Sequence, residues 1–210
     1  MKGDSIVVED HHRLVAEELC SFLIERVLAG SGKYVITVAG ESGSGKSETA
    51  TAIAEMFSHR DINAIIFQQD DYFIYPPKSN DARRRDDILK VGPHEVDVKI
   101  LDSHLRAFSD GVKNIKKPLI DYEGDTIDSE EVHLGGIQVA IAEGTYTSML
   151  ENVDMRIFIA RDYNQTRQHR EKRRRDAAEL DMFIDEVLKI EHRIISSHRT
   201  RADVVINADY

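Results

Sequence analysis

The stretch that decides the fold is YVITVAGESGSGKSETATAIAEMF, residues 34–57. A short apolar run with strand character leads into Gly-x4-Gly-Lys-Ser, and a segment with helical periodicity follows it. Glycine lets the backbone approach a ligand closely, and a helix N-terminus favours an anion, so the N–H groups of the loop can converge on phosphate oxygens. This order of strand, glycine-rich loop and helix predicts a nucleotide site.

The predicted nucleotide site comprises the loop and the first turn of the helix that follows it. Lys46 is expected to reach the β- and γ-phosphates, and the Ser47 hydroxyl is expected to ligate Mg²⁺. The full set of predicted cofactor-binding residues is Gly40, Glu41, Ser42, Gly43, Ser44, Gly45, Lys46, Ser47 and Glu48.

The composition is that of a globular protein. Of the 210 residues, 41% are hydrophobic and 31% are charged, a balance that can bury a core. The net charge of -10 disfavours nucleic acid and anionic membranes as partners. Cys20 is the only cysteine, so no internal disulfide can form. The opening MKGDSIVVEDHHR has no apolar core of a signal peptide, and we expect a cytoplasmic protein.

Strand-like and helix-like segments alternate along the chain, which predicts one α/β domain over residues 1–210. The expected architecture is the three-layer α/β/α P-loop NTPase fold, with a central parallel sheet, an N-terminal helix and an arginine-rich lid. Asp10 is expected to cap the N-terminal helix and Gly30 to end it. The expected helices are 10–30, 46–59, 96–108 and 164–199, and the expected strands are 34–39, 62–68, 136–143, 155–160 and 202–207.

Two segments fit this alternation less simply, and each allows two interpretations. Residues 74–92 are polar and contain prolines, so they are either a solvated loop or a flap over the substrate. Residues 161–180 crowd arginines into an acidic protein, which indicates either a solvated helix face or a lid that closes over ATP phosphates. The N-terminal helix could pack on its own chain or on a second copy in a homo-oligomer.

Carboxylates follow two of the expected strands. Asp70 and Asp71 come directly after residues 62–68, and Glu143 ends the strand 136–143. Ligands of open α/β sheets bind at the carboxyl ends of strands, so one aspartate could accept a proton from an attacking hydroxyl and Glu143 could hold Mg²⁺. The alternative for each is an ordinary turn or cap residue. Because guanine-reading Asn-Lys-x-Asp and transporter-type Leu-Ser-Gly-Gly motifs are absent, phosphoryl transfer to a small molecule is the favoured chemistry.

From Tyr34 onward the chain resembles the uridine kinase and phosphoribulokinase family of P-loop kinases. The matching segments are GESGSGKS, QQDDYF, AIAEGTY, the arginine-rich stretch and RADVVINAD. The resemblance implies an ATP- and Mg²⁺-dependent kinase in which Asp70 is the general base and Ser47 and Glu143 serve the metal. It also implies catalytic roles for Lys46, Arg170 and Arg174, and substrate contacts from Asp70, Phe73, Asp121 and Tyr122.

The acceptor half departs from the uridine kinase pattern. The Tyr-Asp-Phe-x-x-His-x-Arg stretch of uridine kinases becomes IDYEGDTI, with Ile120, Asp125 and Ile127 at the tyrosine, histidine and arginine positions. Loss of groups that hydrogen-bond a nucleoside leaves the acceptor open. It is a nucleoside or related compound, or a non-nucleoside alcohol such as a sugar or a pantothenate-like compound. A nucleotide-binding regulatory module without transfer activity is the third possibility.

Overall fold

A parallel sheet forms the centre of the molecule, which we describe from a computed structural model. The structure describes residues 1–3, 6–30, 32–162, 165–166 and 182–207. The sheet order is β2-β5-β1-β6-β7, with bounds Tyr34–Gly40 for β1, Ala64–Gln68 for β2, Val139–Gly144 for β5, Met155–Ile159 for β6 and Val204–Ile206 for β7. All neighbouring strands in it are parallel, as the alternation of strands and helices predicts.

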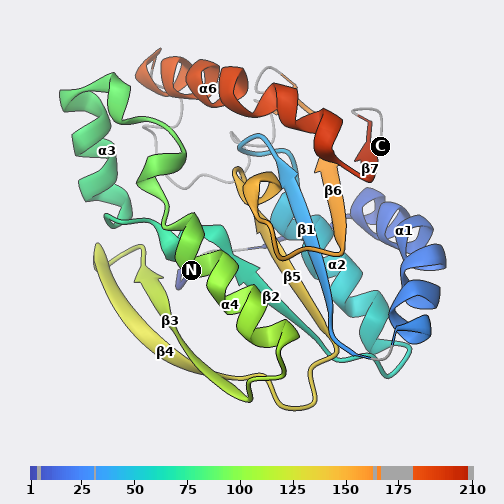
Figure 1. Cartoon of the computed structure of the whole chain (residues 1–210). Coiled ribbons are helices and arrows are strands. Elements are labelled where there is room, and N and C mark those ends of the chain that lie inside the picture. Colours follow the sequence, from blue (N-terminus) through green and yellow to red (C-terminus); the bar gives the residue numbers. More distant parts are fainter. Residues whose placement is uncertain (4–5, 31, 163–164, 167–181, 208–210) are drawn as a thin grey trace.

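Helices cover both faces of this sheet, which confirms the three-layer α/β/α prediction (Figure 1). Because successive strand residues point to opposite faces, Ile36 packs in the core beneath α1 and α2, and Val35 packs in the core beneath α4. The helices span Asp10–Ala29 for α1, Lys46–Ser58 for α2, Pro77–Asp86 for α3, Val98–Ser109 for α4 and Met182–Ile195 for α6.

Helix α1 packs on its own chain. Its buried residues, among them Leu19 and Leu23, belong to the core shared with α2. The predicted stop at Gly30 is confirmed, but the predicted Asp10 cap is wrong because the helix begins one residue earlier than that cap requires. Glu9 is the N-cap, and its backbone N–H donates to His12 Nδ1 at 3.0 Å.

A two-stranded antiparallel hairpin lies outside the main sheet and was not predicted. It consists of β3 (Asn114–Asp121) and β4 (Thr126–His133), and Asp121 pairs with Thr126 at the turn. Asp125 adopts a left-handed backbone conformation there, with φ of 51°. In Figure 1 the hairpin lies beside α4 and below α3, so it faces the carboxyl end of β2.

Segment 74–92 has the helix α3 at its centre, and many of its residues are exposed. The choice between a solvated segment and a substrate flap stays a prediction. The expected helix 164–199 is confirmed over Met182–Ile195 and gives way to a 3-10 helix at Ser196–Arg201, while its first part, apart from residues 165–166, lies outside the described residues. No helix within the described ranges has the length and apolar character needed to cross a membrane.

Candidate active site

The glycine-rich loop closes on itself between β1 and α2. Gly40 has a φ of 157°, and a Cβ there would lie 2.8 Å from Ser44 Oγ, so a side chain would collide with the loop. The carbonyl of Glu41 accepts hydrogen bonds from the Ser44 N–H at 3.1 Å and from Lys46 Nζ at 2.9 Å. The Lys46 ammonium therefore lies over the loop, close to the backbone that is predicted to hold phosphates.

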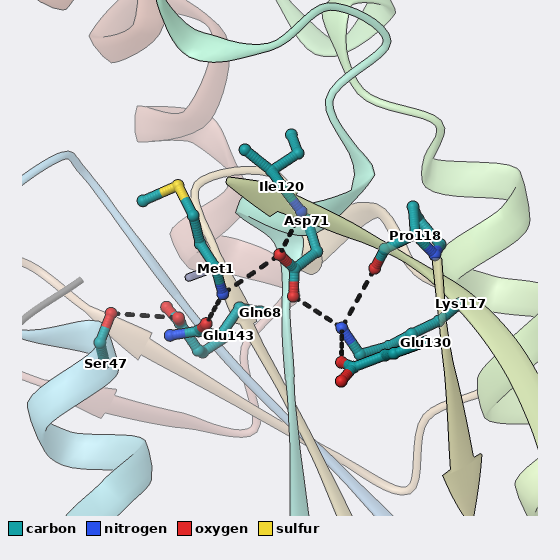
Figure 2. Close-up of polar contacts among 9 residues, drawn as sticks. All are labelled: Met1, Ser47, Gln68, Asp71, Lys117, Pro118, Ile120, Glu130 and Glu143. Carbon is teal, nitrogen blue, oxygen red and sulfur yellow. Dashed lines mark hydrogen bonds and ion pairs between the residues drawn. The ribbon is translucent and has the colours of Figure 1, made fainter. Parts of the chain in front are cut away.

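Ser47 and Glu143 meet at the carboxyl end of the sheet, although 96 residues separate them (Figure 2). The Ser47 hydroxyl donates to Glu143 Oε1 at 3.0 Å. The pKa of Glu143 is raised to about 7, chiefly by burial and then by the negative charge of Asp70, while Lys46 and the Ser47 hydrogen bond oppose the shift. A buried carboxylate of raised pKa is a place where a cation would be stabilising.

This pair of oxygen donors fits Mg²⁺. Magnesium binds proteins through one or two carboxylates and takes its remaining ligands from phosphates and water. The described residues contain no group of three or more His, Cys, Asp or Glu that could hold a metal. Any Mg²⁺ held by Ser47 and Glu143 would therefore share its coordination with a bound nucleotide.

Asp70 and Asp71 follow β2 in a 3-10 turn, Gln69–Tyr72, and face different surroundings. Asp71 is buried, and its carboxylate accepts from Lys117 Nζ at 2.7 Å and from the Ile120 N–H at 3.1 Å (Figure 2). Asp70 is half-buried and lines a cavity of about 160 Å³. The structure therefore gives the two aspartates different surroundings, and Asp70, which the family resemblance singles out, is the one that lines the cavity.

The cavity beside Asp70 brings together residues from three parts of the chain. Phe73 follows the turn, Arg84 comes from α3, and Tyr122 follows β3. Asp121, also a predicted substrate residue, is not part of this lining. Its carboxylate lies at the hairpin turn, where hydrogen bonds from the Gly124 N–H and Lys2 Nζ lower its pKa. A substrate role for Asp121 stays a prediction.

A second cavity, of about 360 Å³, lies between the Ser47–Glu143 pair and the hairpin. Lys117 reaches it from β3, and its ammonium lies 2.7 Å from both Asp71 Oδ2 and Glu130 Oε1. The amino group of Met1 lies 3.1 Å from Asp71 Oδ1 and also contacts Gln68 Oε1 (Figure 2). Residues at the start of the chain thus lie in the same cleft, where Lys2 pairs with β3 through backbone hydrogen bonds to Ile120 and Tyr122.

Helix α3 is anchored at the opposite side of the cleft. Arg84 binds both oxygens of Glu95, at 2.5 and 2.9 Å, and lies 3.5 Å from Glu191 of α6. Burial raises the pKa of Glu191, and Arg84 opposes this. The next residue on α6, His192, contacts Glu41 of the loop, with Nδ1 and Oε1 2.5 Å apart. Helix α6 therefore contacts both the loop and α3.

Several residues of this cleft had no sequence signal. The hairpin brings in Lys117, and α6 brings in Glu191 and His192, whose partners lie far away in sequence. Glu95 comes from the 3-10 turn Pro93–Glu95 and binds Arg84, 11 residues before it. The predicted lid arginines Arg170 and Arg174 lie outside the described residues, as does most of 161–180.

A loop between a parallel strand and a helix, with a carboxylate at the end of the neighbouring strand, is typical of P-loop nucleotide-binding proteins. The pattern of the Phosphoribulokinase / Uridine kinase family matches residues 35–205, and the chain belongs to that family. This confirms the resemblance found in the sequence.

Individual relatives differ in what their names say they act on. The bifunctional alpha-galactosidase/sucrose kinase AgaSK of Mediterraneibacter gnavus is 29% identical over 189 residues, which cover 84% of this chain and 20% of that protein. The uridine kinase of Clostridium novyi is 26% identical over 185 residues, covering 82% of this chain and 86% of that protein. This chain thus spans a fifth of the length of AgaSK and most of the uridine kinase.

Among solved structures, a putative fructose transport system kinase from Silicibacter sp. TM1040 has a similar fold. Its TM-score is 0.65 at 19% identity, and the match covers 91% of this chain and 98% of that one. The likeness supports the fold assignment and says nothing by itself about the acceptor.

Proposed function

We propose that this protein transfers the γ-phosphoryl group of ATP, in the presence of Mg²⁺, to a hydroxyl group of a small molecule. One observation carries the proposal: Ser47 donates to Glu143, and the charges of Lys46 and Asp70 are both close enough to act on the Glu143 carboxyl, while Asp70 also lines a cavity. Membership of a kinase family supports the same reaction class. A donor site and an acceptor site beside each other are what in-line phosphoryl transfer requires.

Each group in the cleft has a proposed part in this transfer. The loop amides and Lys46 bind the phosphates, and Ser47 and Glu143 hold Mg²⁺, which neutralises charge on the β- and γ-oxygens. Asp70 accepts the proton of the acceptor hydroxyl while the acceptor's oxygen forms the new bond to the γ-phosphorus. The bond from that phosphorus to ADP breaks, and ADP leaves. Arg170 and Arg174 are proposed, from the family resemblance, to stabilise charge on the transferring group.

We further propose that the acceptor carries no negative charge, which favours a sugar or a nucleoside over a pantothenate-like carboxylate. Among the described residues that line the two cavities, four cationic groups are each paired with a carboxylate: Arg84 with Glu95, Lys117 with Asp71 and Glu130, Lys2 with Asp121, and the Met1 amino group with Asp71. An anionic acceptor would meet Asp70 with no unpaired cation among these lining residues to offset the repulsion. The sugar kinase in the name of AgaSK supports a neutral hydroxyl compound, as do the uridine kinases.

The test is a screen of purified protein with ATP, Mg²⁺ and a panel of neutral sugars, nucleosides and pantothenate, following acceptor-dependent ADP release. We expect turnover with one neutral compound and little with pantothenate. Faster turnover with pantothenate than with the neutral compounds would contradict the proposal of a neutral acceptor, but it would support the proposed phosphoryl transfer. Tight ATP binding without turnover on any acceptor would instead favour the regulatory module.

A further inference from the structure

The second residue of the phosphate loop carries a negative charge. Glu41 follows Gly40 directly, and its side chain is 7% exposed, so water screens this charge poorly. Its own carbonyl accepts hydrogen bonds from Ser44 and Lys46, which places Glu41 within the turn that is proposed to hold phosphates. A carboxylate at such a place raises the free energy of a bound polyphosphate unless a positive or donor group offsets it.

His192 is positioned to offset this charge. Its Nδ1 lies 2.5 Å from Glu41 Oε1, so the proton between them makes a charge-assisted hydrogen bond, and a protonated ring makes an ion pair. The two residues are 151 positions apart in the sequence, and the packing of α6 across the loop brings them together. Buried Leu188 and Ile195 on α6, together with the Glu191–Arg84 contact, hold the helix in that place.

We infer that His192 is a positioning residue for the nucleotide: it holds the Glu41 carboxylate against α6 and offsets its charge, so that the loop accepts the phosphates of ATP. The inference rests on the nucleotide site proposed above and does not depend on the acceptor or on transfer. Removing His192 takes away a group that offsets the charge of the buried Glu41 carboxylate, and the affinity lost should grow with the number of phosphates on the ligand.

The test is a double-mutant cycle with direct binding of ATP, ADP and AMP, measured by calorimetry without any acceptor. For His192→Ala we expect ATP affinity to fall about tenfold, ADP affinity to fall less, and AMP affinity to stay close to that of the wild type. Glu41→Gln removes the charge itself, so this variant should bind ATP more tightly than His192→Ala does. The double variant should resemble Glu41→Gln, because the carboxylate that His192 offsets is already removed.

Conservative variants and a control distinguish positioning from packing. His192→Lys keeps a positive group near Glu41 and should retain most of the ATP affinity. His59→Ala removes an exposed histidine at the end of α2 and should bind ATP normally. If His192→Ala fails to fold, as shown by its thermal unfolding midpoint, His192→Gln replaces it in the cycle.

Two results would overturn the inference while leaving the nucleotide site in place. Equal losses for ATP, ADP and AMP would show that His192 acts through packing. Additive losses in the double variant would show that Glu41 and His192 act independently. If the wild type binds no ATP, the proposed donor site fails and the inference fails with it.

Discussion

At the scale of single residues, the neighbours Asp70 and Asp71 have different surroundings. Asp71 accepts a hydrogen bond from Lys117, whereas Asp70 lines the cavity that we propose for the acceptor. We expect Asp70→Asn to leave ATP affinity unchanged and to lower kcat by roughly 10²–10⁴-fold, the usual contribution of a positioned base. Steady-state kinetics with the acceptor found in the screen, together with ATP calorimetry, would measure both values. Unchanged kcat would exclude Asp70 as the base, and exposed Asp86→Asn serves as a control.

Residues that belong to a short motif could be predicted from the sequence, and residues defined by a distant contact could not. Gly40, Lys46 and Ser47 follow from local spacing, and Glu143 follows from its place at a strand end, where the structure brings it 3.0 Å from Ser47. The contact between Glu41 and His192 depends on how α6 crosses the loop. Nothing in the residues around His192 indicates that crossing.

At the scale of elements, a buried ion pair between Lys117 of the hairpin and Asp71 joins the hairpin to the turn after β2. Asp71 and Lys117 have side chains only 3% and 7% exposed. Lys117→Met would leave Asp71 buried without this cation, and we expect it to lower the free energy of unfolding by ~3–5 kcal/mol, as for other broken buried pairs. Urea unfolding of the single variants and of Asp71→Asn/Lys117→Met measures the effect, and the double variant should recover part of the loss. A single Lys117→Met variant as stable as the wild type would contradict this role.

The elements that could be predicted are those that bury a regular apolar pattern. The strands of the main sheet read as nearly continuous apolar runs because both of their faces are covered. Helix α3 gave no such signal, because Asn80 is its only fully buried residue. Strand β4 gave no such signal either, since most of its residues are exposed and three of them are carboxylates. Helix α3 lines the cavity proposed for the acceptor and Glu130 of β4 lines the other cavity, so the least predictable part of the fold is also the part proposed to select the substrate.

At the scale of the whole molecule, buried ionisable groups act on stability in opposite directions as the pH changes. Burial raises the pKa values of Glu143 and Glu191, so the folded state holds protons that the unfolded chain has released. Glu143 therefore favours folding increasingly as the pH falls from about 7 towards the pKa of the unfolded chain, and Glu191 acts in the same direction. Burial lowers the pKa values of His104 and His198, with positive charge from Lys117 and Arg201 adding to the effect. As the pH falls through the pKa values of these histidines, they therefore lower the stability of the fold, opposite to the effect of the two carboxyls.

The histidine contribution can be isolated by comparing variants across pH. His104 Nδ1 lies 3.0 Å from the Tyr72 hydroxyl, and His198 Nδ1 lies 2.8 Å from Ser148 Oγ, so both rings are held in hydrogen bonds inside the fold. Below pH about 6.5 the unfolded chain protonates these rings before the folded chain does, so their contribution to stability falls with falling pH. A His104→Gln/His198→Gln variant should be less stable than the wild type at pH 7.5, and the difference in unfolding free energy should narrow at pH 5.5. Urea unfolding at the two pH values measures this. A difference that stays constant would show that neither histidine is held neutral by the fold.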